Sequence, residues 1–321
     1  MTSEDPVSLR LKATMKRFLV STAKNKIFVD FDSVVGSVKP EFQPALHAFR
    51  HSVEATVSTV ELPLSLASAS SERIHFQRIH TSEWLLARAR AIEEGKDVDD
   101  EETIEFTRSE ALSLAGTRMR EFTQSEEGGN ALTLDTCEFL LRSLENGLGD
   151  AADQLLQQGL VLLWSAFEVL YRDTFETLLN IDPSRITALM NEPATRKRFE
   201  AERLPLDTIA EFGFDLSGHL GTVLVSKQDF SDLPTVKAVY AVLYPQSREL
   251  RDALAQRDLW TLYQQRHLIV HRRGIIDQAY RQATGDTAEV GAQLAVTPSA
   301  FNGHLKVVAL AATGLARCLC V

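Results

Sequence analysis

The sequence predicts an all-α protein, with a C-terminal helical bundle preceded by an N-terminal, mostly helical domain. Apolar residues recur at helical spacing along most of the chain, as at Ala111, Ala115 and Phe122. Polar segments that contain glycine separate these stretches, as turns and helix ends do. Only two short runs, residues 26–31 and 294–297, are typical of strands.

The N-terminal region of unknown role is expected to span residues 1–130. A turn is predicted at Ser68–Ser71, and the polar segment Glu126–Asn130, with two glycines, indicates the domain boundary. The helices expected before this boundary are 9–20, one following Pro44, 83–94 and 99–122.

The C-terminal bundle is expected to span residues 131–321. Asp135 with Glu138 fits a capping pair at the start of its first helix. A long helical segment from Ser247 to about Tyr280 is expected to bend at Gly274. The other expected helices are 150–180, one or two within 184–203, 206–214, 230–244 and 299–319.

The net charge of −10 argues against a protein that coats nucleic acid without selectivity. The acidic excess lies in residues 1–150, which hold 17 basic and 25 acidic residues, whereas residues 151–321 hold 17 and 19. From Arg266 to Arg281 there are four arginines and one aspartate. This local positive field is of the sign that attracts RNA.

Three cysteines, with no Cys-x-x-Cys pair, predict neither a disulfide framework nor a zinc site. The N-terminus lacks the basic start and apolar run of a secretory signal, and no uninterrupted apolar stretch of about 18 residues occurs. A cytoplasmic protein that needs no cofactor is therefore expected.

The candidate catalytic motif of the sequence is residues 266–271, Arg-His-Leu-Ile-Val-His. Arginine holds a phosphate through its planar guanidinium, and histidine exchanges a proton near neutral pH. Cleavage of RNA by its own 2′-hydroxyl needs both abilities. Arg266 and His271 are therefore the first candidate residues, and His267, four residues before His271, shares a helix face with it.

A carboxylate lies within an apolar stripe of the helix from Asp150. Helical spacing places Trp164, Tyr171, Phe175 and Leu178 on one face, and Glu168 falls within that face. A buried carboxylate needs a cation or a donor, so we expect Glu168 to pair with Arg266 or another basic residue of the motif helix. The alternative is that Glu168 reaches water at the rim of the bundle.

The spacing of the motif also predicts a homodimer. Arg266 and His271 are separated by about 140° around an ideal helix, so they flank a groove rather than converge. Two motif helices related by a two-fold axis would bring two such sets around one cleft.

This pattern resembles the Arg-x4–6-His signature of the HEPN superfamily, over roughly residues 133–321. The segments Trp164–Glu168 and Gly274–Asp277 resemble those of HEPN domains in bacterial defence systems. The resemblance implies a metal-independent endoribonuclease that acts as a dimer, in antiviral defence or as a growth-arresting toxin. The products would be a 2′,3′-cyclic phosphate and a 5′-hydroxyl.

The resemblance also implies residue roles. Arg266 would stabilise the scissile phosphate, His271 would be the general acid and base, and Glu168 would orient the site. His267 would be the polar residue that follows the arginine. RNA-binding candidates are Arg272, Arg273 and Tyr280.

The sequence departs from the family pattern at two positions. Arg272 stands where relatives often have asparagine, and Arg273 stands where partner-modified toxins have tyrosine. The two arginines fit RNA binding or a helix C-terminus. Three further functions stay open: a non-catalytic HEPN scaffold that dimerises or binds a regulatory partner protein, an unrelated helical enzyme, and a metal site that would use His267 and His271.

Overall fold

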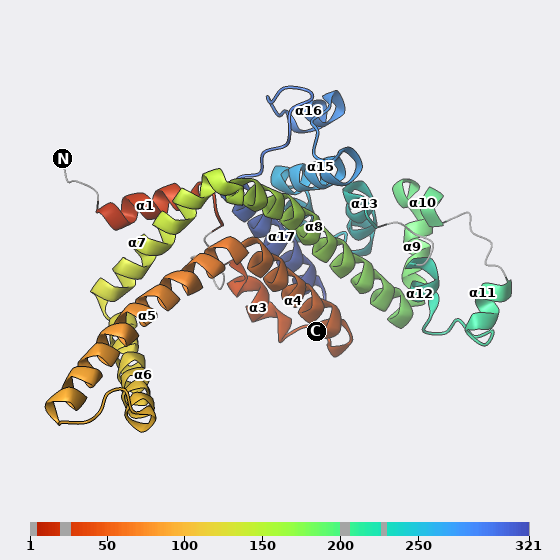
Figure 1. Ribbon diagram of the computed structural model, residues 1–321. Coiled ribbons are helices and arrows are strands. Elements are labelled where there is room, and N and C mark those ends of the chain that lie inside the picture. Colours follow the sequence, from red (N-terminus) through yellow and green to blue (C-terminus); the bar gives the residue numbers. More distant parts are fainter. Residues whose placement is uncertain (1–4, 20–26, 200–205, 226–229, 321) are drawn as a thin grey trace. The chain divides into compact units, whose positions relative to one another are not determined.

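The computed structural model of the protein describes residues 5–19, 27–199, 206–225 and 230–320 (Figure 1). Every regular element in these ranges is a helix, which confirms the all-α fold class. The helices are α1 (Pro6–Met15), α3 (Val29–Val35), α4 (Gln43–Val60), α5 (Leu62–Glu93), α6 (Glu101–Gln124), α7 (Glu126–Ser143), α8 (Leu148–Ile181), α9 (Ile186–Asn191), α10 (Pro193–Phe199), α11 (Leu206–Glu211), α12 (Leu220–Val225), α13 (Leu233–Leu243), α14 (Arg248–Leu254), α15 (Arg257–Arg272), α16 (Gln278–Thr284) and α17 (Pro298–Cys318), with 3-10 turns at Pro40–Phe42, Leu144–Asn146 and Pro183–Arg185.

Both predicted strands are wrong. Phe28, Phe31 and Val35 are buried at a spacing of three and four residues, so this segment is helical from Val29 on, and Lys26 lies outside the described residues. Residues 294–297 are irregular, and the nearest pairing is an isolated bridge between Ile275 and Gln293.

Contacts divide the chain into two compact units: residues 1–20 with 61–152, and residues 21–60 with 153–321. This division differs from the boundary predicted at 130/131. The glycine-bearing segment is the first turn of α7, because the Ser125 side chain caps Gly128 at 3.0 Å. Asp135 and Glu138, expected to open a helix, lie within α7.

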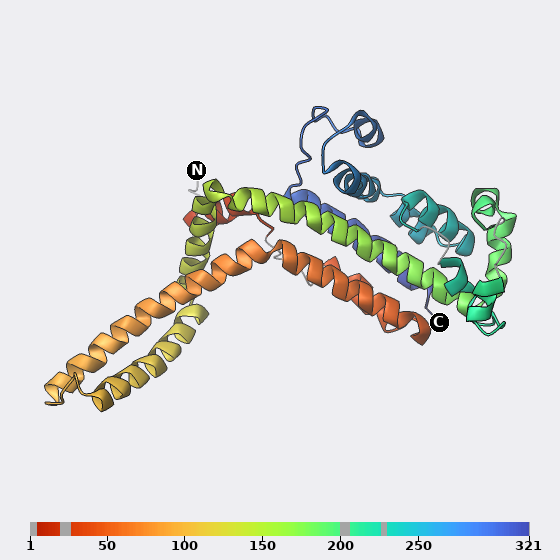
Figure 2. The same cartoon turned by 45° about the vertical axis from the view of Figure 1, so that its right-hand side comes forward.

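The first unit is built on a hairpin of α5 and α6, with α7 packed against it and α1 packed against α7 (Figures 1 and 2). Small buried side chains let these helices approach closely, as at Ala87, Ala91, Ala111 and Ala115. The turn predicted at Ser68–Ser71 is wrong, because α5 continues through it.

The second unit packs around the aromatic face of α8. Trp164, Tyr171 and Phe175 are fully buried, which confirms the predicted stripe. The Tyr171 hydroxyl donates to the Ala311 carbonyl of α17 at 2.9 Å, and the Tyr240 hydroxyl of α13 donates to the Tyr171 carbonyl at 2.5 Å. These bonds satisfy polar groups that burial would otherwise penalise, so α8, α13 and α17 are held together.

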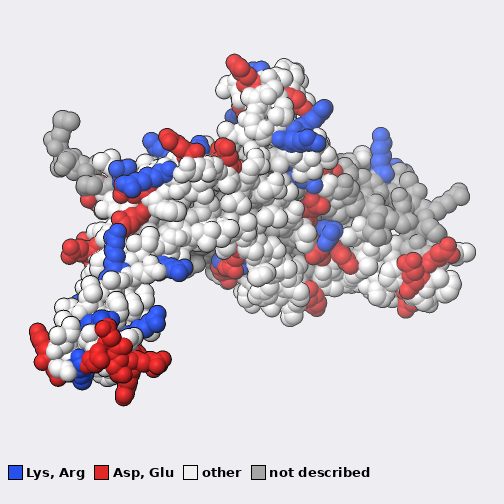
Figure 3. Space-filling model, in the orientation of Figure 1, with Lys and Arg blue, Asp and Glu red and all other residues white. Residues whose placement is uncertain are grey.

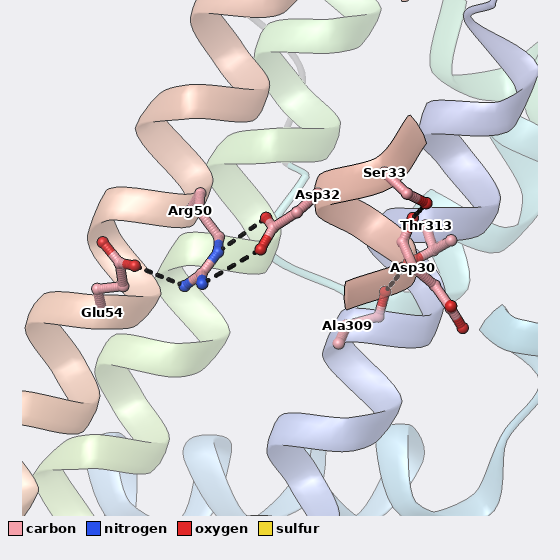
Figure 4. A network of polar contacts seen from close by, with 7 residues as sticks. All are labelled: Asp30, Asp32, Ser33, Arg50, Glu54, Ala309 and Thr313. Carbon is pink, nitrogen blue, oxygen red and sulfur yellow. Dashed lines mark hydrogen bonds and ion pairs between the residues drawn. The ribbon is translucent and has the colours of Figure 1, made fainter. Parts of the chain in front are cut away.

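A surface ion-pair network joins α3 to α4 in the same unit (Figure 4). The Arg50 guanidinium lies between Asp32, at 3.0 Å from Nε, and Glu54, at 3.0 Å from Nη1. It also covers the Phe28 ring, 4.7 Å from its centroid. The Asp32 carboxylate therefore has a structural partner.

Gly159 of α8 is a site of close helix contact. A Cβ there would lie 2.4 Å from Val60 Cγ2 and 2.8 Å from Phe301 Cε2. We expect Gly159→Ala to lower the free energy of unfolding by about 1–3 kcal/mol through overpacking, measured by urea unfolding. The control is Gly116→Ala in α6, where a Cβ meets nothing within 4 Å and the better helix propensity of alanine should stabilise slightly. Equal effects of both substitutions would contradict this account of the packing.

Candidate functional site

The motif helix α15 ends at a left-handed turn. Arg273 has φ 55° and Gly274 has φ 75°, and the Gly274 amide donates to the Leu268 carbonyl at 3.1 Å. This is the C-cap that glycine favours, so the helix stops one residue before Arg273. The single segment expected from Ser247 to Tyr280 is accordingly three helices, α14, α15 and α16.

Residues beyond the cap fold back onto α15. The Trp260 indole donates to the Ala283 carbonyl at 2.9 Å, and the Arg257 guanidinium donates to the Thr284 carbonyl at 3.0 Å. At the other end, the Gln293 amide donates to the Arg273 carbonyl at 3.1 Å. Both ends of α15 are therefore fixed, which holds the motif side chains on a supported helix.

Arg266 lies half-buried on α15. Its Nε atom is buried and has no hydrogen-bond partner, and no described carboxylate forms an ion pair with its guanidinium. The buried Trp164 Nε1 of α8 is also without an acceptor. Trp164 packs against Tyr263, one turn before Arg266, with ring centroids 5.2 Å apart. A guanidinium whose charge is not neutralised retains its capacity to bind an anion.

The two motif histidines lie next to each other at the surface. The rings of His267 and His271, both exposed, have centroids 4.5 Å apart. Partial burial lowers the pKa of His267, and the charges of His271 and Arg266 lower it further. A lowered pKa favours the neutral imidazole at pH 7, the form that accepts a proton.

Glu168 does not pair with Arg266. Within the described part of the chain, no hydrogen bond or ion pair joins the two side chains. Glu168 is half-buried on α8 and takes part in other interactions. The predicted glutamate–arginine pair is therefore not formed in this conformation.

The three RNA-binding candidates differ in exposure. Arg272 and Arg273 are exposed, and Arg272 forms a loose ion pair with Asp277 at 3.7 Å. Lys and Arg side chains lie over α15 and α16 in Figure 3. Tyr280, in contrast, is 3% exposed, and its hydroxyl donates to Asp286 at 3.2 Å. Tyr280 cannot stack on a base from this position, so its predicted RNA contact is replaced by a structural role.

A buried polar network beneath the motif was missed by the sequence reading. The Tyr280 hydroxyl accepts a bond from Gln265 at 3.4 Å, and Gln265 contacts His304 Nε2 at 2.9 Å. His304 Nδ1 lies 3.1 Å from the Asp258 carbonyl. Gln265, next to Arg266, is thereby fixed to α16 and α17. The sequence signal that could have revealed this network is Gln265, an amide within an otherwise apolar face of the helix.

The protonation of His304 decides how this network is bonded. Burial lowers the pKa of His304, so the neutral ring is favoured. The Gln265 carbonyl oxygen faces His304 Nε2, so a neutral ring that carries its proton on Nε2 donates to Gln265, and the Gln265 amide nitrogen donates to the Tyr280 hydroxyl.

The lowered pKa of His267 can be measured directly. We expect its ring protons to titrate below the ordinary value of about 6.5 in an NMR pH titration. Since positive charge on His271 disfavours a second charge at His267, His271→Ala should move that pKa upward. Titration of His267 at or above 6.5 in the unmodified protein would refute the assigned cause.

Other site types find no support among the described residues. The three cysteines are free, and no group of three or more His, Cys, Asp or Glu side chains in the described ranges is placed to hold a metal ion. None of the helices described combines the length and apolarity that crossing a membrane requires.

Comparison of the chain with protein-family models, with curated proteins and with solved structures gave no match. The functional interpretation therefore depends on the residues and geometry given above.

Proposed function

We propose that the protein is a metal-independent endoribonuclease of the HEPN type, in which Arg266 and His271 act at a composite site between two copies of the chain. The observation that carries the proposal is an unneutralised guanidinium on a supported helix, one turn from an exposed imidazole pair. Defence against viruses or arrest of growth would be the biological setting.

The chemistry follows from the side chains. A neutral imidazole takes the proton of the RNA 2′-hydroxyl, and the oxygen attacks the adjacent phosphorus. The Arg266 guanidinium stabilises the charge that develops on the phosphate oxygens. Arg272 and Arg273, exposed at the helix end, supply positive charge for the RNA backbone. The bond to the 5′-oxygen breaks, and this oxygen takes a proton from an imidazolium of the site, leaving a cyclic phosphate and a 5′-hydroxyl.

Exposed apolar residues support an interface on the same helix. Val270 is 48% exposed and Ile275 is 41% exposed, on either side of the helix end. An apolar contact between the two imidazole sets would cover these side chains. The same observation favours the second candidate function, a non-catalytic scaffold that dimerises or binds a partner protein through this face.

The function is tested by incubating the purified protein with single-stranded RNA in EDTA and mapping the product ends. We expect 2′,3′-cyclic phosphate and 5′-hydroxyl ends, with no loss of rate on metal removal. Strict dependence on added metal, or 5′-phosphate ends, would exclude the mechanism. Dimerisation without any turnover would favour the scaffold.

A composite site makes a further test possible. If Arg266 of one protomer works with His271 of the other, then mixing Arg266→Ala with His271→Ala protein, under conditions that exchange subunits, restores one intact site in each mixed dimer. We expect activity to return to about one quarter of the unmodified rate, since half of the dimers are mixed and each holds one of two sites. No recovery despite demonstrated exchange would place both residues of each site on one protomer.

A further inference from the structure

The first unit contains an open groove that the proposed nuclease site does not use. It has a volume of about 580 Å³, within the range of small-molecule sites. Leu64, Ser68 and Glu72 line it from one face of α5, at a spacing of four residues. Thr133 and Cys137 line it from α7 at the same spacing.

The groove exists because the facing side chains are short. Ser65 and Ala69 of α5 and Thr133 of α7, all with short side chains, are among its lining residues. Leu11 of α1 and Leu132 of α7 give the groove apolar walls. The groove is open to solvent, since Ser65, Ala69 and Glu72 are exposed, and its volume is that of a small-molecule site.

Two of the four hydroxyl groups that line the groove, those of Thr133 and Thr136, donate to groups elsewhere in the protein. The Thr133 hydroxyl donates to the Gly129 carbonyl at 2.8 Å, and the Thr136 hydroxyl donates to Ser71 at 3.3 Å. Their hydrogen atoms are committed, so the hydroxyl oxygens present lone pairs. Glu72 adds an exposed carboxylate, and none of the described residues that line the groove is Lys, Arg or His.

We propose that this groove binds a small amphiphilic amine. Its apolar body would lie against Leu11, Leu64 and Leu132, and its ammonium group would donate to the Glu72 carboxylate and the Thr133 oxygen. A carboxylate or phosphate ligand would meet the Glu72 carboxylate and no cation among the described lining residues, so the groove favours a cation over an anion. The site does not depend on the nuclease proposal, because Arg266 and the histidines belong to the other unit.

Four probes with the same alkyl chain test the chemistry: octylammonium, octyltrimethylammonium, octanol and octanoate, titrated by calorimetry below their aggregation concentrations. Octylammonium should bind with a dissociation constant on the order of 1 mM, set mainly by its apolar chain. It should bind about three- to tenfold more tightly than octanol, because an exposed ion pair contributes modestly. Octyltrimethylammonium, which has no N–H donor, should be intermediate, and octanoate weakest.

Two kinds of variant locate the site. Glu72→Gln should remove the advantage of octylammonium over octanol, whereas Glu121→Gln, at an exposed position of α6 outside the groove, should keep it. Ala69→Phe should fill the groove and abolish binding of all four probes, with helix content checked by circular dichroism. Ser65→Leu, at another exposed lining position, is the second filling variant.

Cysteine labelling tests the location of the binding site independently. Cys137 lines the groove but is only 2% exposed, so its alkylation is slow in the free protein; octylammonium should slow it further, without affecting Cys318 or Cys320, which lie in the other unit. Equal affinity for all four probes, no binding of octylammonium at millimolar concentration, or undiminished binding in both filling variants would overturn the proposal.

Discussion

Replacing His271 by alanine is expected to lower the rate of RNA cleavage by about 10²–10⁴-fold, the usual contribution of a general acid or base. His271 is exposed, so its removal leaves no cavity and should not change the unfolding free energy measurably. The loss would then be chemical rather than structural. It is measured as kcat/KM on single-stranded RNA, alongside a urea unfolding curve for each protein.

The matched control is His47→Ala. His47 is also an exposed histidine on a helix, and like His267 it has a second histidine, His51, four residues further on. Its replacement should leave cleavage unchanged. Arg266→Ala should reduce cleavage as His271→Ala does, since each removes a group that acts in the same transition state. Activity that persists in the His271→Ala protein would remove this residue from the mechanism.

Trp164→Ala is expected to lower the unfolding free energy by about 3–5 kcal/mol, the cost of deleting a large buried aromatic side chain. Trp164 is fully buried and contacts Phe167, at 4.9 Å between ring centroids, and Tyr263 of the motif helix, at 5.2 Å. Its loss leaves a cavity between α8 and α15. The measurement is urea unfolding followed by circular dichroism, because the remaining tryptophans, Trp84 and Trp260, lie in different units and both would contribute to the fluorescence.

The Trp164→Phe variant distinguishes the contribution of apolar packing to stability from that of the indole N–H. The indole N–H of Trp164 is buried without an acceptor, so a phenyl ring keeps most of the apolar contact and removes an unsatisfied donor. We expect this variant to be clearly more stable than Trp164→Ala. Similar destabilisation by both substitutions would show that the indole N–H is bonded and that Trp164 does more than pack.

The helical fold could be predicted because its signal is local. The apolar stripe of Trp164, Tyr171 and Phe175 and the end of α5 before Gly95 are both read from spacing and helix-ending residues. The two compact units were not predictable in this way. Residues 21–60 join the C-terminal part through contacts distant in sequence, such as Val60 against Gly159.

Glycine was misleading at one position and informative at another. Gly128 occupies the first turn of α7, where a Cβ would meet the Phe122 carbonyl oxygen at 1.8 Å, so it serves helix contact rather than a domain break. Gly274 ends α15 with a positive φ. The same residue type supports both, and only tertiary context distinguishes them.

Part of the candidate site could be predicted from the sequence. Helical spacing brings His267 and His271 together, because four residues make about one turn. The expected partnership of Glu168 with Arg266 depended on which side chains meet between two helices, which periodicity does not determine. Tyr280 is buried because hydrogen bonds hold the segment after Gly274 in place, and no local sequence pattern predicts this burial.

The central claim, attack by the RNA 2′-hydroxyl at the Arg266–His271 site, is tested most directly with a set of oligonucleotides in which a single ribonucleotide is unmodified and every other carries a 2′-O-methyl group. The four members of the set place each base in turn at the unmodified position. In EDTA, we expect cleavage only on the 3′ side of the unmodified ribonucleotide, with a cyclic phosphate end, and none with the His271→Ala protein. Cleavage at methylated positions, or products that end in a 3′-hydroxyl, would contradict the claim.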